Sequence, residues 1–269
     1  MNPKLYAAGL LASLGVATVT WFISLLKRNV SVVDGAWALM FVAAAAVYAY
    51  GTGRLTERMA LILVLLVLWA VRLSGHIIVR NWGEPEDRRY RDIRRKYEPH
   101  FALKSLGIIF WFQAGLAWII SMPLWPALAV TVEAGVFDVL AVAVWAAGLS
   151  FESVADWQLS RFRMDPANDG KVMDRGLWRY TRHPNYFGEC LIWWGFYLFA
   201  LSTGAWWTIP GPMLLTYVLL KFSGVTLMEQ NIAERRPGYR AYMARTNAFI
   251  PGPPKRGGQN SVSPYGGAI

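Results

Sequence analysis

The sequence predicts an all-α, polytopic membrane protein with about seven transmembrane helices. Hydrophobic residues make up 55% of the 269-residue chain, and the mean hydropathy is positive at +0.30. Several apolar runs approach the roughly 20 residues that a helix needs to cross about 30 Å of hydrocarbon. The basic residues, which give a formal net charge of +10, fall in short segments between these runs. This distribution is typical of cytoplasmic loops that face anionic lipid.

The apolar runs predict where the individual spans begin and end. The last two are joined by the tight link "STGAWW", and Pro210 and Pro212 mark the first turn or a kink of the final helix. We expect an N-terminal three-helix part with a cytoplasmic loop over 1–104, a C-terminal four-helix part with a cofactor loop over 105–251, and a disordered Pro- and Gly-rich tail over 252–269. The predicted spans are 5–26, 32–50, 59–79, 105–125, 136–157, 187–203 and 206–228.

The positions of Lys and Arg predict the orientation in the bilayer. The first, third and fifth loops and the end of the chain after Glu229 are basic, whereas the loops near 126–135 and 202–205 contain no Lys or Arg. The positive-inside rule therefore predicts an external N-terminus and a cytoplasmic C-terminus. Arg54 and Arg58 in the second loop are outnumbered exceptions.

Composition also bears on the classes of partner. No basic soluble domain is evident, so we expect no binding to nucleic acid. The single cysteine, Cys190, excludes an intrachain disulfide, and the three histidines lie far apart in the sequence, so we expect no metal site. The first apolar run, 5–26, is long enough to span and is read as a helix, not as a cleavable signal.

Charged side chains inside apolar spans gather at one end of the predicted bundle. Arg72, His76 and Arg80 recur every four residues, and Glu152 and Asp156 have the same spacing, so each set lies on one helical face. The pattern indicates a water-accessible chamber open to the cytoplasm. Snorkelling of long side chains to the interface is the alternative, and it suits short carboxylates poorly.

The loop between the fifth and sixth spans carries groups that suit a phosphate-bearing cofactor. Arginines suit phosphates, Asp or Asn suits hydroxyls and amides, and aromatic faces suit a flat ring. Pro184 is expected to start the sixth helix, with polar residues in its first turns. A lone histidine is more often a structural hydrogen-bonding group than a ligand. The loop's candidate cofactor-binding residues are Asp156, Arg163, Asn168, Trp178, Arg182, His183, Asn185, Tyr186 and Glu189.

The block "GLWRYTRHPNYFGE" (176–189) resembles the C-terminal signature of the steroid 5-alpha-reductase-type membrane reductases, especially their bacterial DUF1295 branch. "SVVDGAWAL", "RNWGEPEDRRYRDIRR", "ESVADWQLSRFR" and "ERRPGYRAYMARTNAFIP" are similar to other blocks of that branch, so the likeness covers nearly all of 30–251. A related motif occurs in sterol carbon-14 reductases. The resemblance implies a seven-helix fold, cytosolic NADPH, and reduction of a carbon–carbon double bond in a lipid. It points to the bacterial inner membrane, with the cofactor site facing the cytoplasm.

The resemblance also implies roles for single residues. Asp156, Arg163, Trp178, Asn185 and Tyr186 match positions that contact the cofactor in these families. Glu229 and Tyr242 lie near the positions where sterol reductases carry an acid and a final Tyr close to the nicotinamide.

Tyr90, at the end of "EPEDRRY", is the candidate proton donor, with Glu229 as its neighbour or replacement. A loop aromatic packed at the membrane interface is the alternative role for Tyr90. Steroid specificity is not indicated, because the steroid enzymes' Gln-Glu pair is absent here and their His-Tyr-x-His-Arg block reads "SGHIIVR".

Two other functions stay open at this point. Isoprenylcysteine carboxyl methyltransferases, which use S-adenosylmethionine, also resemble the C-terminal part. The extra N-terminal helices, the pair Asp156 and Arg163 and the full 176–189 block favour a reductase. A non-enzymatic membrane scaffold would leave the polar groups in the spans unexplained. No recognisable pattern in the sequence identifies the lipid substrate, decides between NADPH and NADH, or gives the oligomeric state.

Overall fold

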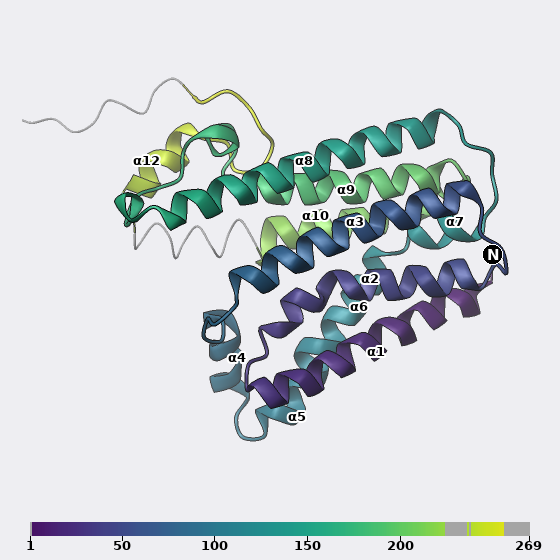
Figure 1. Ribbon diagram of the computed structural model, residues 1–269, viewed down its shortest axis with the longest axis horizontal. Helices are drawn as coiled ribbons and strands as arrows, with labels where there is room; N and C mark the ends of the chain where they lie inside the picture. The colour runs from purple at the N-terminus through teal and green to yellow at the C-terminus, as the bar shows by residue number, and fades with distance from the viewer. Residues whose placement is uncertain (1, 224–235, 237, 256–269) are drawn as a thin grey trace, which may run out of the picture. The chain divides into compact units, whose positions relative to one another are not determined.

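The computed structural model describes residues 2–223, 236 and 238–255, and the regular elements within these ranges are all helical (Figure 1). Short 3-10 turns cover Pro166–Asn168, Gly176–Arg179 and Trp206–Thr208, and π-helical segments cover Leu106–Trp111 and Val218–Ser223. The helices are α1 (Pro3–Lys27), α2 (Val32–Tyr50), α3 (Glu57–Arg80), α4 (Arg88–Tyr97), α5 (Phe101–Ser105), α6 (Phe112–Ile120), α7 (Leu124–Ala129), α8 (Val136–Met164), α9 (Pro184–Leu201), α10 (Pro210–Tyr217) and α12 (Gly238–Arg245).

Five helical stretches within the described ranges are long and apolar enough to cross a membrane. They are Pro3–Lys27, Val32–Tyr50, Glu57–Arg80, Phe101–Ile120 and Val136–Met164. They correspond to the first five predicted spans, and the prediction of an all-α polytopic membrane protein is confirmed. Helices α9 and α10 begin near the predicted starts of the last two spans, but residues 224–228 of the seventh lie outside the described residues. The total of seven spans and their orientation stay predictions.

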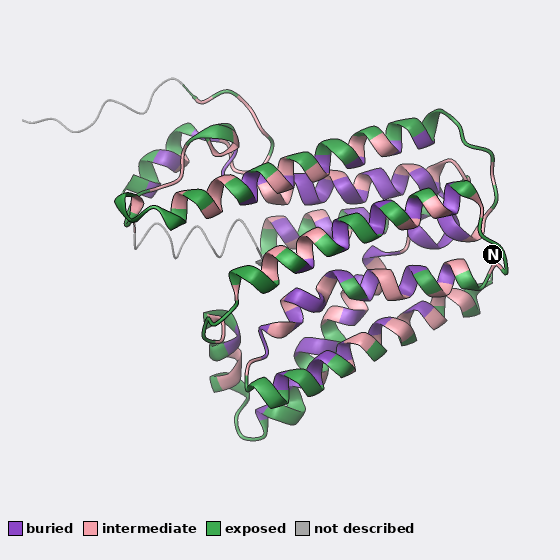
Figure 2. Cartoon of the chain, in the orientation of Figure 1, coloured by how far each residue is buried: buried purple, intermediate pink, exposed green. Residues whose placement is uncertain are grey.

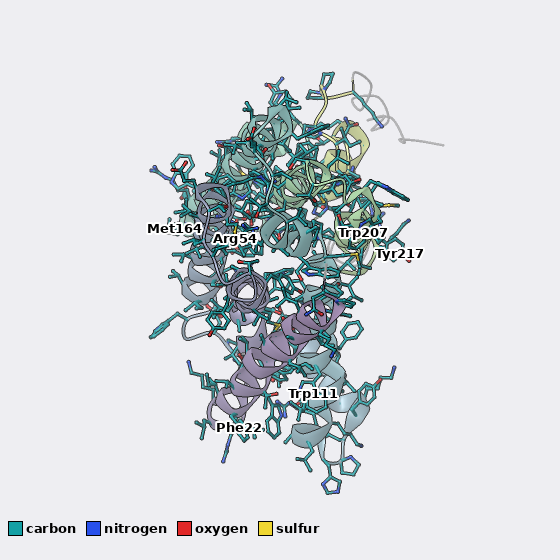
Figure 3. All side chains as sticks on the ribbon, turned by 90° about the vertical axis from the view of Figure 1, so that its right-hand side faces the viewer. Phe22, Arg54, Trp111, Met164, Trp207 and Tyr217 are labelled. Atoms are coloured by element: carbon teal, nitrogen blue, oxygen red, sulfur yellow. The ribbon has the colours of Figure 1, made fainter. Side chains whose placement is uncertain are left out.

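Many large apolar residues of these helices are exposed, and exposed positions recur along the helices in Figure 2. Phe22 on α1 is 57% exposed and Trp111 is 46% exposed; both are labelled in Figure 3. A surface helix of a water-soluble protein instead turns its polar residues outward and its apolar residues toward the core. Exposed apolar faces of this extent are expected where hydrocarbon, not water, is the solvent.

The chain forms two compact units, and each is described by itself. Unit 1 consists of residues 1–141 and 196–214, and unit 2 consists of residues 142–195 and 215–269. The boundaries between them fall inside α8, α9 and α10. The division expected from the sequence, with a boundary after residue 104, stays a prediction.

Unit 1 is built on close contacts between its first helices. Helix α1 packs along α2, and α2 packs along α3. The contact between α1 and α2 requires a small residue, because a Cβ on Gly9 would lie 2.4 Å from the ring of Tyr48. The Ser13 hydroxyl donates a 3.0 Å hydrogen bond to the Met40 carbonyl across the same contact. Small side chains and buried hydroxyls thus join helices whose outer faces are apolar.

Unit 2 is built on a helix contact between α8 and α9 in which backbone meets backbone. A Cβ on Gly148 would lie 2.7 Å from both the Gly188 carbonyl oxygen and the Ile192 amide nitrogen. A Cβ on Gly188 would lie 2.6 Å from the Glu152 amide nitrogen. The two backbones therefore touch, and Asp156, further along α8, is brought to Asn185, which precedes Gly188 on α9.

The end of the described chain docks on the loop of unit 2. The Thr181 hydroxyl donates to the Phe249 carbonyl at 2.7 Å, and the Gly252 N–H donates to the Tyr180 carbonyl at 3.0 Å. The Lys255 N–H donates to the Arg245 carbonyl at 2.8 Å. Residues 256–269, the rest of the tail predicted to be disordered, lie outside the described residues.

Candidate functional site

Tyr90, the predicted proton donor, lies in unit 1 on the inner face of α4. Its side chain is 6% exposed, and its hydroxyl donates a short, 2.5 Å hydrogen bond to Oδ1 of Asp34 in the first turn of α2. The Gln113 amide, on α6, donates to the Tyr90 hydroxyl at 3.1 Å. Three helices thus contribute one phenol, one carboxylate and one amide to a single buried cluster.

The electrostatics of this cluster favour a Tyr90 that keeps its proton. Burial, followed by the nearby charge of Asp34 and the hydrogen bond to it, raises the pKa of Tyr90 well above its ordinary value. The guanidinium of Arg89 donates to the other carboxylate oxygen, Oδ2 of Asp34, at 3.1 Å. The phenol is therefore a retained hydrogen-bond donor at neutral pH, and Asp34 is held between it and a cation.

The segment that leads into α4, the helix of Tyr90, is fixed to the start of α2. Glu86 accepts two hydrogen bonds from the Arg94 guanidinium, at 3.0 and 2.8 Å, and one from the Val30 N–H at 2.9 Å. The Ser31 hydroxyl accepts from the Asp87 N–H at 2.8 Å. These contacts clamp the segment before α4, so the position of the phenol is set by backbone as well as by side chains.

The predicted cofactor residues all lie in unit 2, and two pairs of them meet where α8 faces α9. The Asn185 amide donates to Oδ1 of Asp156 at 3.1 Å. The rings of His183 and Tyr186 are stacked, with centroids 5.5 Å apart and an interplanar angle of 3°. Glu189, one turn beyond Asn185, is 7% exposed. The first turns of α9 thus combine amide, carboxylate and aromatic groups, and their binding of a ligand stays a prediction.

Three other predicted cofactor residues use their polar groups to hold α12. The Arg182 guanidinium donates to the carbonyls of Met243, at 3.1 Å, and Thr246, at 2.5 Å. The Tyr242 hydroxyl donates to the Trp178 carbonyl in a very short contact, and the Trp178 indole N–H donates to the Ala155 carbonyl at 3.1 Å. Burial raises the pKa of Tyr242. These side chains position the loop and the terminal helix.

The remaining predicted residues are placed separately. The Asn168 amide donates to the Phe162 carbonyl at 3.1 Å and closes the turn after α8. Arg163 is exposed in the last turn of α8. Glu229 lies outside the described residues, as does any contact it makes. No group of three or more His, Cys, Asp or Glu suited to a metal ion occurs in the described ranges.

Sequence reasoning missed two members of the Tyr90 cluster as site residues. Neither Asp34 nor Gln113 was named as a candidate site residue. Each stands alone in an apolar run, "SVVDGAWAL" and "IIFWFQAGLAW", and a solitary polar group in such a run is the signal that could have found it.

Comparison with known proteins gives a family match over most of the chain. Residues 20–246 match the model of a family described as "Protein of unknown function (DUF1295)". An uncharacterized protein of Schizosaccharomyces pombe is 28% identical over 280 aligned positions, which cover 93% of this chain and 80% of that protein. No solved structure matches the chain.

Proposed function

The chain belongs to the DUF1295 family, a steroid 5-alpha-reductase-like group, and we propose that it is a membrane-embedded, NADPH-dependent reductase of a carbon–carbon double bond in a lipid. The observation that carries the proposal is the buried contact between Tyr90 and Asp34. A phenol that keeps its proton and is oriented by a carboxylate 2.5 Å away, inside a membrane protein, is a proton donor next to which an apolar substrate can bind.

Reduction of a conjugated double bond needs a hydride at one carbon and a proton at the adjacent carbon or at the conjugated carbonyl oxygen. Bound NADPH supplies the hydride. Tyr90 supplies the proton, and the phenolate that remains takes one back from water. Asp34, which accepts the phenol's hydrogen bond, orients the hydroxyl. Gln113, which donates to the phenol oxygen at 3.1 Å, holds it in place during the exchange.

The residues of unit 2 fit a dinucleotide by the chemistry of their groups. The Asp156 carboxylate and the Asn185 amide suit a ribose hydroxyl or a carboxamide, and the exposed Arg163 fork suits a phosphate. The stacked rings of His183 and Tyr186 offer an aromatic face. Trp178, Arg182 and Tyr242 act on the cofactor through the backbone that they fix.

The distribution of Lys and Arg supports an orientation in which these groups face the cytoplasm, where NADPH is available. A bacterial inner membrane suits this arrangement. The long apolar helices suit a sterol, polyprenyl or acyl chain as the substrate's body.

The test is a binding and turnover comparison on the purified protein in detergent. NADPH, NADH and S-adenosylmethionine are compared by thermal stabilisation, because a ligand that binds the folded state raises the melting temperature. NADPH should stabilise the native chain and lose this effect in Asn185→Ala. Oxidation of NADPH in the presence of a panel of steroid, polyprenyl and acyl enones then measures turnover.

Tyr90→Phe should keep the stabilisation by NADPH. It should lower turnover by about 10²- to 10⁴-fold, because it removes the hydroxyl that donates the proton. Asp34→Asn should have a similar but smaller effect. Stabilisation by S-adenosylmethionine alone would rule the reductase out in favour of a methyltransferase.

A further inference from the structure

A cavity of about 460 Å³ in unit 2 lies between the loop before α9 and the end of α12. Its lining contains none of the residues predicted to bind the cofactor. It is far too large for a bare ion and lies within the range of small-ligand pockets. The lining residues are Asp174, Arg175, Gly176, Arg179, Arg245, Thr246 and Pro254.

The charges around this cavity are unbalanced. Three guanidinium groups line it, and one carboxylate, Asp174, forms an ion pair with Arg245. Within the part of the chain that the structure describes, the side chains of Arg175 and Arg179 form no ion pair. Two positive charges therefore face the cavity without an acidic partner from the described residues, and an anion would be attracted to it.

The backbone that carries these arginines is fixed. Gly176 has a φ of +57° and packs on Gln158, where a Cβ would lie 2.3 Å from the side-chain amide. The Gln158 side chain accepts a 3.0 Å hydrogen bond from the Leu177 N–H, so the turn between Arg175 and Arg179 is anchored to α8. A residue with a Cβ at Gly176 would be strained at this φ and would push the Gln158 side chain aside.

The opposite wall is fixed as well. Thr246 is 3% exposed, and its carbonyl accepts a 2.5 Å hydrogen bond from the buried Arg182 guanidinium. The Arg245 carbonyl accepts from the Lys255 N–H at 2.8 Å, which brings the 251–255 segment over the same wall. The cavity is thus lined by arginines whose main chain is held in place before any ligand binds.

We propose that this cavity binds a phosphate group carried by an organic ligand. Guanidinium forks match phosphate oxygens in bidentate hydrogen bonds, and two uncompensated forks on one turn suit a single dianionic group. Two sources share this chemistry: the 2′-phosphate of a nucleotide and the headgroup of an anionic phospholipid. The proposal does not depend on the reductase activity.

The experiment measures the affinity of the full-length protein, in neutral detergent, for two soluble phosphate ligands. 2′,5′-ADP carries the nucleotide's 2′-phosphate without a redox ring, and 5′-ADP is its control. Dihexanoyl phosphatidic acid carries the lipid phosphate, and dihexanoyl phosphatidylcholine is its control. The double variant Arg175→Gln, Arg179→Gln is compared with Arg240→Gln, an exposed arginine of α12 outside the lining.

We expect the native chain to bind one of the two ligands and the double variant to bind it at least about tenfold more weakly, given charge-assisted hydrogen bonds. Arg240→Gln should leave the affinity unchanged. An effect confined to 2′,5′-ADP identifies a nucleotide phosphate, and an effect confined to phosphatidic acid identifies a lipid headgroup. Equal melting temperatures of the ligand-free variants show that folding is intact.

The proposal is overturned if the native chain binds neither ligand, or if the double variant binds as tightly as the native chain. Either result leaves the reductase proposal standing, because stabilisation by NADPH and its loss in Asn185→Ala are measured separately. Conversely, 2′,5′-ADP has no nicotinamide, so this site can be confirmed even if no reduction is found.

Discussion

The guanidinium Nε of Arg58 donates a 2.7 Å hydrogen bond to Oδ1 of Asp138, and both side chains are more than nine-tenths buried in unit 1. Arg58 also donates to the carbonyls of Ala127 and Phe199 and to the Ser202 hydroxyl, at 2.7 to 2.8 Å. One side chain thus joins the start of α3 to α7, the start of α8 and the end of α9. Burying an ion pair costs desolvation free energy. That cost is offset only if the remaining polar atoms of both side chains form hydrogen bonds.

Removing one partner of this pair should destabilise the protein severely. Arg58→Met leaves the Asp138 carboxylate buried with only the Gly135 N–H, at 2.9 Å, among the described hydrogen bonds. The free energy of unfolding should fall by about 3–5 kcal/mol. The double variant Arg58→Met, Asp138→Leu should recover a substantial part of that loss. Denaturant unfolding in detergent measures both.

The matched control for this pair is Arg54→Gln. Arg54, labelled in Figure 3, lies in the loop just before α3, but its side chain is exposed and, among the described residues, donates only to the Thr131 hydroxyl, at 2.5 Å. Its replacement should change the free energy of unfolding by less than about 0.5 kcal/mol. Equal losses at Arg54 and Arg58 would contradict a central role for the buried pair.

The contact between α8 and α9 should tolerate no added carbon. In Gly148→Ala the new Cβ meets backbone atoms of Gly188 and Ile192 at 2.7 Å, and backbone cannot move aside as a flexible side chain can. We expect a loss of about 1–3 kcal/mol in unfolding free energy. Gly75→Ala on α3 is the control, since a Cβ there has nothing within 4 Å. That control should be neutral or slightly stabilising.

The clamp before α4 should weaken in acid. Burial opposes ionisation of Glu86, but hydrogen bonds from Arg94 and from the Val30 N–H outweigh it and hold the pKa of Glu86 below its ordinary value. A carboxylate with a depressed pKa contributes stability that is complete above the pKa of the unfolded chain and is lost as pH falls through the folded pKa.

The melting temperature of the native chain should therefore drop as the pH falls below about 4. In Glu86→Gln this part of the drop should be absent, while the melting temperature at neutral pH should already be lower. Glu84→Gln, an exposed residue of the same loop, should follow the native curve. Superimposable curves for all three proteins would show that Glu86 has no part in the acid response.

Arg182 should stabilise α12 against local unfolding. In Arg182→Gln the carbonyls of Met243 and Thr246 lose their charged donor, and hydrogen exchange in 238–252 should rise by about tenfold or more. Exchange in α2 should not change. Arg240→Gln on the same helix should leave both segments as in the native chain. A rise spread evenly over the protein would indicate global destabilisation and not a local role.

The sequence predicted the five apolar spans because length and hydropathy are local properties. It ended the fifth span at residue 157, whereas α8 continues to Met164. Hydropathy marks where a helix leaves hydrocarbon, and the polar stretch "DWQLSRFR" keeps its backbone hydrogen bonds beyond that point. The fourth span ends at Ile120, five residues earlier than predicted, because a turn before Pro123 starts the separate helix α7.

The candidate site was predictable only in part. Asp156 and Asn185 were both named from the sequence, and their contact follows from the nearby glycines of α8 and α9. The partner of Tyr90 was not found, because Asp34 lies 56 residues away and no periodicity encodes such a pairing. Arg58 had appeared only as an exception to the positive-inside rule, and nothing in the sequence linked it to Asp138. Eighty residues separate them, and only the folded helices bring them together.

The hydrogen bonds of Arg58 join parts of the chain that are synthesised at different times. Two of its hydrogen-bond acceptors, Phe199 and Ser202, are translated 141 and 144 residues after Arg58 itself. By then the ribosome has already made residues 142–195 of the other unit. In a nascent chain that ends before Phe199, the Arg58 guanidinium lacks these two hydrogen-bond acceptors. The buried hydrogen bonds of Arg58 can therefore be completed only after the end of α9 has been synthesised.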